Sequence, residues 1–148
     1  MNMQIEIQRA NMVRNQIRPV GVEDSNVTNA MLKIPRHIFI AQKFSSVAYS
    51  DAELPILDDD NKRLIARPEM LAKLLAAAEI TDQDSVLEIG CGTGYVTAII
   101  SQIAKYVIGI DSCKKANNKA QKIIKDLDSE REKNGSTGGR YGCFCDQH

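Results

Sequence analysis

Apolar residues recur at helical spacing in two segments near the start of the chain. The first segment ends at Pro19 and Gly21, after the apolar positions Ile5, Ile7, Met12, Val13 and Ile17. The second segment follows Asp24 and Ser25, whose side chains are both suited to cap free helix amides. Its apolar stripe comprises Val27, Ala30, Met31 and Ile34. The pattern therefore predicts two amphipathic helices before residue 35.

Residues 36–60 lose this periodicity. We expect them to form an ordered loop with short strands that packs over the core that follows. Pro68 then suits the first turn of a third helix, which is expected to end near Ile80. The apolar face of this helix comprises Met70, Leu71, Leu74, Leu75 and Ala78.

Two short apolar runs, residues 85–89 and 106–111, are typical of buried parallel strands. Residues 95–103 between them return to helical spacing, which completes a strand-helix-strand unit long enough for a right-handed crossover. A further helix is predicted over residues 114–127, with lysines outside. Its apolar side comprises Ala116, Ala120, Ile123, Ile124 and Leu127. The chain is therefore predicted to be an α/β protein with a parallel sheet.

The last segment, residues 129–148, is polar and rich in glycine, and we expect it to be a disordered tail. It contains Cys143, Cys145 and His148, but a structural zinc site needs four ligands at workable spacing, so no metal site is expected. The predicted parts of the chain are an N-terminal helical and loop segment, a partial core and this tail, over residues 1–60, 61–128 and 129–148.

Charge and hydropathy narrow the possible partners of the chain. Its 148 residues include nineteen basic and nineteen acidic side chains, so no net positive charge favours nucleic acid or an anionic membrane surface. There is no run of about eighteen apolar residues, and the N-terminus lacks the pattern of an export signal. We expect a cytoplasmic protein that binds a small molecule or another protein. Its four cysteines are too few for a disulfide framework and are expected to be reduced.

Three glycines follow the first predicted strand at once, within the sequence Glu88-Ile89-Gly90-Cys91-Gly92-Thr93-Gly94. A sharp turn from strand to helix needs φ values that glycine tolerates, and a ligand approaches such a backbone without meeting a Cβ atom. The spacing is Glu-x-Gly-x-Gly-x-Gly, unlike the G-x-G-x-x-G of dinucleotide sites, and the chain has no Gly-Lys-Ser/Thr of a phosphate loop. We interpret the turn as a cradle for a small cofactor.

Two carboxylates bracket this turn. Glu88 suits a positively charged cofactor with an amino group better than a pyrophosphate, because unlike charges attract. Asp111 ends the next strand, where acidic residues of nucleotide-binding folds accept the ribose hydroxyls. Both features favour S-adenosylmethionine, with Glu88, Gly90, Cys91, Gly92, Gly94 and Asp111 as the candidate binding residues. A purely structural turn and a nicotinamide or flavin site remain as alternatives.

The segment from Val86 to Gly94 and the strand that ends at Asp111 resemble the first two strands of class I S-adenosylmethionine-dependent methyltransferases. Residues 31–40 (MLKIPRHIFI) and 48–56 (AYSDAELPI) resemble the N-terminal segment of the protein-L-isoaspartate O-methyltransferase family. This resemblance covers roughly residues 12–127. It implies part of a doubly wound, Rossmann-like parallel sheet, with an N-terminal helical segment. It also implies transfer of a methyl group from S-adenosylmethionine to the isoaspartyl carboxylate of a damaged protein or peptide.

The same resemblance implies that Asp51, Leu64, Ala66, Arg67 and Pro68 lie near the substrate. The family has threonine and serine hydroxyls at the positions of Leu64 and Ala66, and a serine there is thought to contact the substrate carboxylate. No catalytic residue is therefore assigned. After Leu127 no further strand of the family is recognisable. Three hypotheses result: an active methyltransferase of this type, a non-catalytic remnant or binding module of the family, and a nicotinamide-dependent oxidoreductase fragment.

Overall fold

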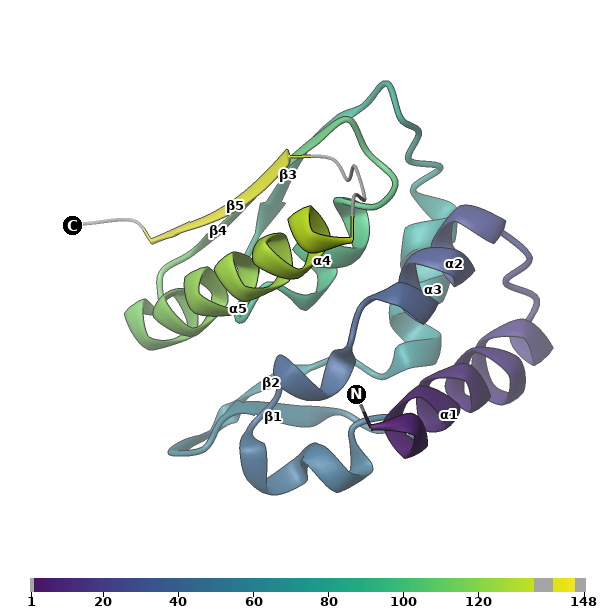
Figure 1. Cartoon of the computed structure of the whole chain (residues 1–148), viewed down its shortest axis with the longest axis horizontal. Helices are drawn as coiled ribbons and strands as arrows, with labels where there is room; N and C mark the ends of the chain where they lie inside the picture. Colours follow the sequence, from purple (N-terminus) through teal and green to yellow (C-terminus); the bar gives the residue numbers. More distant parts are fainter. Residues whose placement is uncertain (1, 135–139, 146–148) are drawn as a thin grey trace. The chain divides into compact units, whose positions relative to one another are not determined.

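The computed structural model describes residues 2–134 and 140–145, and the chain divides into two compact units (Figure 1). The N-terminal unit comprises Met1–Glu79 and the C-terminal unit comprises Ile80–His148. The sequence analysis expected a boundary after residue 60. The boundary lies later because helix α3 (Pro68–Ala77) packs against the helices α2 (Ser25–Lys33) and η1 (Val13–Ile17) of the N-terminal unit.

The two predicted N-terminal helices are both present. Helix α1 (Met3–Met12) continues as the π-helical turn η1 and the 3-10 turn η2 (Arg18–Val20), and Gly21 ends the segment with a φ of +89°. Helix α2 is capped as expected, because the Asp24 carboxylate accepts hydrogen bonds from the backbone N–H groups of Asn26 and Val27. The apolar periodicity therefore predicted both helices and the cap of the second.

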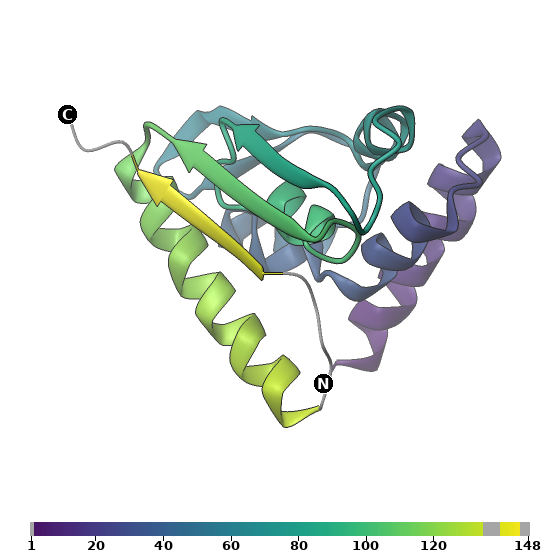
Figure 2. The same ribbon diagram turned by 90° about the horizontal axis from the view of Figure 1, so that it is seen from above.

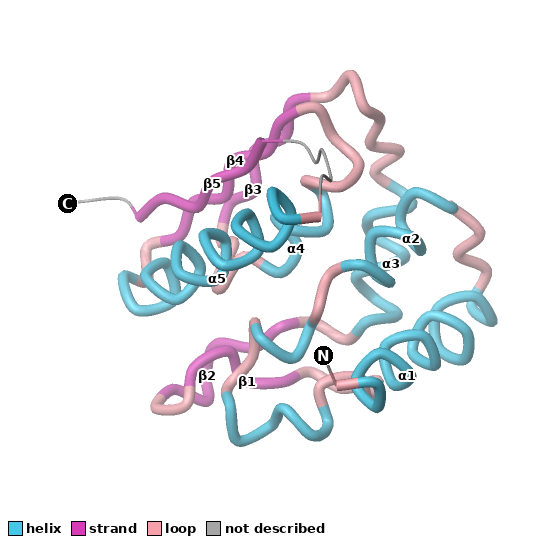
Figure 3. Tube along the Cα trace, in the orientation of Figure 1, coloured by secondary structure: helices cyan, strands magenta, loops and turns pink. Residues whose placement is uncertain are grey.

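Short elements fill the segment that lost its periodicity, as expected. Two 3-10 turns, η3 (Arg36–Ile38) and η4 (Gln42–Val47), precede an antiparallel hairpin of β1 (Leu54–Leu57) and β2 (Asp60–Ile65) (Figure 3). All four residues of β1 are buried, whereas only the last residue of β2 is buried. The hairpin thus contributes one strand to the core of the N-terminal unit.

A buried arginine holds the irregular part of this unit together. Arg36 is fully buried, and its guanidinium donates hydrogen bonds to the carbonyl oxygens of Ala48 (2.8 Å), Ala52 (3.2 Å) and Ala66 (3.0 Å). Buried carbonyl groups need such partners, since an unsatisfied one costs free energy. One side chain therefore joins the loop after η4, the approach to β1 and the end of β2.

The C-terminal unit is built on a three-stranded parallel sheet, which confirms the predicted α/β class. Its order is β3-β4-β5, and the strands are β3 (Ser85–Ile89), β4 (Tyr106–Asp111) and β5 (Arg140–Cys145). Helices α4 (Tyr95–Ile100) and α5 (Lys114–Lys133) both contact this sheet and lie on the same side of it (Figures 1 and 2). Both bounds of β3 and of β4 agree with the sequence analysis.

The two faces of this sheet differ in exposure. On the face that carries the helices, Val107 is fully buried and Asp111 is 4% exposed. On the other face, Leu87 and Ile89 of β3 are 61% and 79% exposed, and Tyr106 of β4 is exposed as well. Parallel sheets are normally covered on both faces, so this apolar surface is unusual.

The prediction of a disordered tail over residues 129–148 was wrong for two segments. Helix α5 extends to Lys133, where Arg131 lies 3.8 Å from the Asp128 carboxylate and 3.5 Å from the Ser101 hydroxyl. Residues 140–145 form β5, which pairs with β4 along its whole length and places Cys143 in the core. Pairing with a distant strand supplies the burial that the local composition lacks. The rest of the tail, residues 135–139 and 146–148, lies outside the described residues.

Over the described ranges, 2–134 and 140–145, no helix is long and apolar enough to cross a membrane. The same ranges contain no group of three or more histidine, cysteine, aspartate or glutamate residues placed to hold a metal ion.

Replacing Arg36 by methionine tests the role of the buried arginine. Arg36→Met would leave the buried carbonyl of Ala48 and the partly buried carbonyls of Ala52 and Ala66 without their donor, and we expect the free energy of unfolding to fall by about 3 kcal/mol or more. Urea unfolding followed by circular dichroism measures the change. Arg14→Met is the matched control, since Arg14 is exposed and bonds to its neighbours Asn11 and Asn15. Equal stability of the two variants would contradict this role.

Candidate functional site

The glycine turn connects β3 to α4 in the C-terminal unit. Gly90, Gly92 and Gly94 have φ values of +81°, +56° and +87°, which lie in the left-handed region that residues with a Cβ atom rarely adopt. Gly94 is also the residue that precedes the first turn of α4. A Cβ atom added at Gly90 would meet nothing within 4 Å, so open space lies against the backbone there. The turn therefore has the conformation and the free space expected of a ligand cradle.

Backbone hydrogen bonds fix this turn to the end of β4. The N–H groups of Gly90 and Cys91 both donate to the carbonyl oxygen of Ile110, at 2.7 and 3.1 Å. These two bonds follow directly on the ladder between β3 and β4, whose last register pair is Ile89 and Ile110. The turn is thus an extension of the parallel pairing.

Asp111 anchors the turn through its side chain. One carboxylate oxygen accepts the N–H of Gly92 at 2.8 Å, and the other accepts the N–H of Cys113 at 2.7 Å. Asp111 therefore joins the glycine turn to the residue that precedes α5.

A glycine on β4 allows the turn to approach the sheet closely. A Cβ atom at Gly109 would lie 2.7 Å from the Cβ of Cys91 and 2.7 Å from the Thr97 hydroxyl oxygen, distances that real Cβ atoms do not show. A larger residue would displace the turn and α4 from the strand. The role of Gly109 was not predicted, because residues 106–111 were interpreted only as an apolar strand. A glycine inside a strand can nevertheless indicate a close approach of another backbone segment.

Glu88 lies at the end of β3 and is partly buried. Burial raises the pKa of its carboxyl above the ordinary value of 4.5. The hydrogen bond that the Thr97 hydroxyl donates to this carboxylate opposes that rise, and the nearby charge of Asp111 adds to it. A cation beside Glu88 would stabilise the ionised form. The site therefore combines two neighbouring carboxylates with a glycine backbone, an arrangement suited to a positively charged ligand that carries hydroxyl groups.

Sequence reasoning missed two side chains that contact this region. Thr97 of α4 donates to Glu88, and Cys143 of β5 lies near the same hydroxyl. Thr97 is on the first turn of a helix that was identified only by its apolar spacing, and Cys143 was assigned to the tail. The contact of Thr97 with Glu88 could have been inferred from the position of Thr97 on the predicted helix, nine residues after Glu88.

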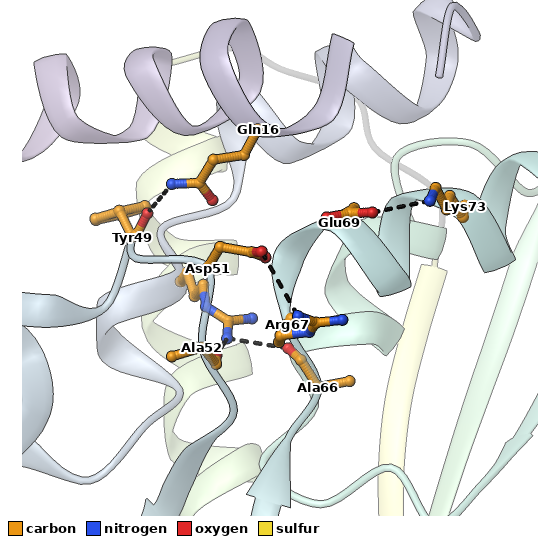
Figure 4. Close-up of polar contacts among 9 residues, drawn as sticks. Gln16, Tyr49, Asp51, Ala52, Ala66, Arg67, Glu69 and Lys73 are labelled. Carbon is orange, nitrogen blue, oxygen red and sulfur yellow. Dashed lines mark hydrogen bonds and ion pairs between the residues drawn. The ribbon is translucent and has the colours of Figure 1, made fainter. Parts of the chain in front are cut away.

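The residues expected near a substrate gather in the N-terminal unit. The Asp51 carboxylate lies 3.9 Å from the Arg67 guanidinium, and both side chains are partly exposed (Figure 4). The carbonyl of Ala66 accepts a hydrogen bond from buried Arg36, and Pro68 begins α3. Leu64, on β2, is 48% exposed. The unit therefore brings Asp51 and the loop before α3 together.

Comparison with known proteins gives the family context. The family model described as Protein-L-isoaspartate(D-aspartate) O-methyltransferase (PCMT) matches residues 7–144, a span that includes most of β5. Protein-L-isoaspartate O-methyltransferase 2 of Geotalea uraniireducens is 38% identical over 123 residues, which are 83% of this chain and 55% of that protein. Protein-L-isoaspartate O-methyltransferase of Geobacter metallireducens is 37% identical over 84% of this chain and 56% of its own length. The chain therefore spans about half the length of these curated relatives.

Two solved structures share the fold. A protein-L-isoaspartate O-methyltransferase superposes with a TM-score of 0.70 at 24% identity, over 93% of this chain and 41% of that one. A second structure, from Plasmodium falciparum, superposes with a TM-score of 0.68 at 21% identity, over 95% of this chain and 62% of the other. This second structure is that of a protein described as a protein-L-isoaspartate O-methyltransferase, in complex with S-adenosyl-L-homocysteine.

The raised pKa of Glu88 predicts how the free energy of unfolding depends on pH. The stability that Glu88 contributes is present below the pKa of the unfolded chain and is lost as the pH rises through the higher pKa of the folded protein. Glu88→Gln does not titrate, so we expect its free energy of unfolding, relative to that of the wild type, to increase as the pH rises above 4.5. Urea unfolding over a pH series measures the difference.

Glu130→Gln is the control for this measurement, because Glu130 is an exposed glutamate on α5 of the same unit. We expect it to follow the wild type at every pH. A Glu88→Gln variant that loses stability relative to the wild type as the pH rises would show that burial of Glu88 is not the dominant effect.

Proposed function

Because the chain belongs to the protein-L-isoaspartate (D-aspartate) O-methyltransferase family, we propose that it binds S-adenosylmethionine and methylates isoaspartyl carboxylates. The observation that carries the proposal is the turn from β3 to α4, where three left-handed glycines lie between Glu88 and Asp111. The open space at Gly90 supports a ligand there. A nicotinamide site has no comparable support, given the glycine spacing and the family.

The proposed roles of the cofactor residues follow from their chemistry. The ionised Glu88 carboxylate would attract the positively charged amino group of the ligand, and Asp111 would accept hydrogen bonds from its ribose hydroxyls. Gly90 would let the ligand lie directly against the backbone, Gly92 and Gly94 would supply the left-handed conformations of the turn, and Cys91 would keep the turn narrow. S-adenosylmethionine supplies, when bound, a methyl group on a sulfonium sulfur. All six residues belong to the C-terminal unit.

The chain's residues need to supply little acid-base chemistry for this reaction. An isoaspartyl carboxylate is ionised at neutral pH, so positioning it in line with the S-methyl bond and excluding water would supply most of the rate. Arg67 is the candidate that presents a cation for this carboxylate, because guanidinium groups match carboxylates in geometry. Its present partner, Asp51, lies 3.9 Å away and is partly exposed, so the pair is loose enough to exchange. Arg67 would therefore compensate in part for the missing hydroxyl at Ala66.

A second candidate function is binding without turnover. The exposed apolar face of the sheet at Leu87 and Ile89 favours this alternative, because a complete parallel sheet is covered on both faces. Cofactor binding tests the part that both candidates share, and methyl transfer separates them.

Calorimetry with S-adenosylhomocysteine tests cofactor binding. We expect the wild type to bind at concentrations well below about 1 mM, and Glu88→Gln to bind at least about tenfold more weakly, because it loses the charge that attracts the amino group. Glu130→Gln is the control and is expected to bind like the wild type. No heat of binding to the wild type at about 1 mM ligand would rule out the proposed site.

Transfer of labelled methyl groups to an isoaspartyl peptide tests turnover, with the aspartyl form of the same peptide for comparison. We expect methyl esters on the isoaspartyl peptide alone. Arg67→Ala is expected to lower kcat/KM by about tenfold or more, through the lost contact with the substrate carboxylate. Lys73→Ala removes an exposed cation of the neighbouring helix α3 and is the matched control. Cofactor binding without transfer to either peptide would favour the binding module.

A further inference from the structure

Two cysteines from distant parts of the sequence meet beside the glycine turn. Cys143 of β5 is the register partner of Gly109 on β4, and Gly109 is in turn the partner of Glu88 on β3. Cys91 reaches the same place from the turn, since its Sγ would lie 2.9 Å from a Cβ atom at Gly109. The Sγ of Cys143 would lie 3.1 Å from a Cβ atom at Gly94. The absence of side chains at two glycines therefore makes room for both thiols.

The two thiols are in direct contact. Cys91 and Cys143 are free cysteines, they share a hydrogen bond, and they are only 6% and 2% exposed. They belong to one buried cluster with Ala120 and Ile124 of α5. Neither sulfur takes part in the chemistry of the proposed methyl transfer. Two neighbouring thiols can form a disulfide once one of them has been oxidised to a sulfenic acid.

A chain of hydrogen bonds connects this pair to Glu88. Cys143 donates to the Thr97 hydroxyl oxygen, with 3.8 Å between Sγ and Oγ1, and that hydroxyl donates to the Glu88 carboxylate. The hydrogen bond between the thiols raises the pKa of Cys91 and lowers the pKa of Cys143. Cys143 is therefore the thiol that ionises first, and its proton has a path through Thr97 to Glu88.

We propose that Cys91 and Cys143 form a redox-active dithiol, which a peroxide converts into a disulfide that crosslinks the glycine turn to β5. The placement of both thiols in one buried cluster, their positions beside Gly109 and Gly94 and the hydrogen-bonded path from Cys143 to Glu88 carry this proposal. Cys143 attacks first, and Cys91 resolves the product.

The reaction balances with hydrogen peroxide as the oxidant. The Cys143 thiolate attacks one peroxide oxygen and forms a sulfenic acid, while the O–O bond breaks and the leaving hydroxide takes the proton held by Glu88. The Cys91 sulfur then attacks the sulfenic sulfur, and hydroxide leaves with the Cys91 proton as water. Both thiols are oxidised, one peroxide is reduced, and two waters form.

Access to the pair depends on β5. Among residues 2–134 and 140–145, β5 pairs with β4 alone and is an edge of the sheet. Edge strands open at lower free energy than central ones, so a small oxidant reaches buried Cys143 through local opening. The disulfide therefore forms slowly with peroxide, and bulky thiol reagents react more slowly with this pair than with Cys113, which is less buried.

The crosslink would act on the cofactor site, a consequence that rests on the proposed function. A bond from Cys91 to Cys143 draws the turn toward β5 and removes the thiol that donates to Cys143. The backbone N–H of Cys91 and the path from Thr97 to Glu88 both change with it. We expect the oxidised chain to bind S-adenosylhomocysteine at least about tenfold more weakly than the reduced chain, with recovery after treatment with dithiothreitol.

Peptide mapping by mass spectrometry tests the crosslink on the full chain, after hydrogen peroxide and blocking of the remaining thiols. The expected product is a peptide pair joined through Cys91 and Cys143 that has lost two hydrogen atoms and separates on reduction. Cys143→Ser and Cys91→Ser should each abolish it, while Cys113→Ser and Cys145→Ser should retain it. The wild-type measurement does not depend on the folding of any variant.

A wild-type chain that forms no such disulfide, or forms one through Cys113 or Cys145 instead, would overturn the proposal. Equal binding of S-adenosylhomocysteine by the reduced and the crosslinked chain would overturn its effect on the cofactor site. A reduced chain that does not bind S-adenosylhomocysteine would overturn the proposed function, and the peptide map would still decide the dithiol independently.

Discussion

The pairing of the glycine turn with the end of β4 is the constraint on which the candidate site depends. The N–H groups of Gly90 and Cys91 share one carbonyl acceptor, and the N–H of Gly92 bonds to the Asp111 carboxylate. These bonds hold three residues in left-handed conformations, which glycine adopts without steric cost but with a loss of chain entropy. They also place Glu88 and Asp111 at the carboxyl ends of adjacent strands, where parallel α/β proteins bind their ligands. The geometry of the site thus follows from the register of two strands.

The sequence predicted the elements whose signals are local. Local patterns predicted the bounds of β3 and β4, the cap at Asp24 and the glycine turn. Apolar runs, capping residues and glycines act within a few positions along the chain. Strand β5 was not predicted, because its burial comes from pairing with β4 and packing against α5. The local composition of residues 140–145 does not indicate either contact. The role of Gly109, the bond from Thr97 to Glu88 and the contact of Cys91 with Cys143 were missed for the same reason. The roles of the candidate site residues themselves remain predictions.

The C-terminal unit combines a well-defined turn with an incompletely covered sheet. Its helices cover one face, whereas Leu87 and Ile89 are exposed on the other. The chain matches the family model over residues 7–144, yet spans about half the length of its curated relatives. Cofactor binding needs the turn and the two carboxylates, all of which lie in this unit, while turnover also needs a substrate site. The proposed cofactor binding and the proposed catalysis are therefore separable, and the first depends on fewer residues.

Titration of the isotope-labelled chain with S-adenosylhomocysteine, followed by the backbone amide resonances, tests whether the glycine turn is the cofactor site. The account predicts saturable shifts that are largest at Gly90, Gly92, Gly94 and Asp111, with smaller changes at Thr97. The amide of Glu130, an exposed residue near the far end of α5 in the same unit, provides the internal control and should not move. Saturable shifts confined to other residues, or none at all, would contradict the assignment of the turn as the cofactor site.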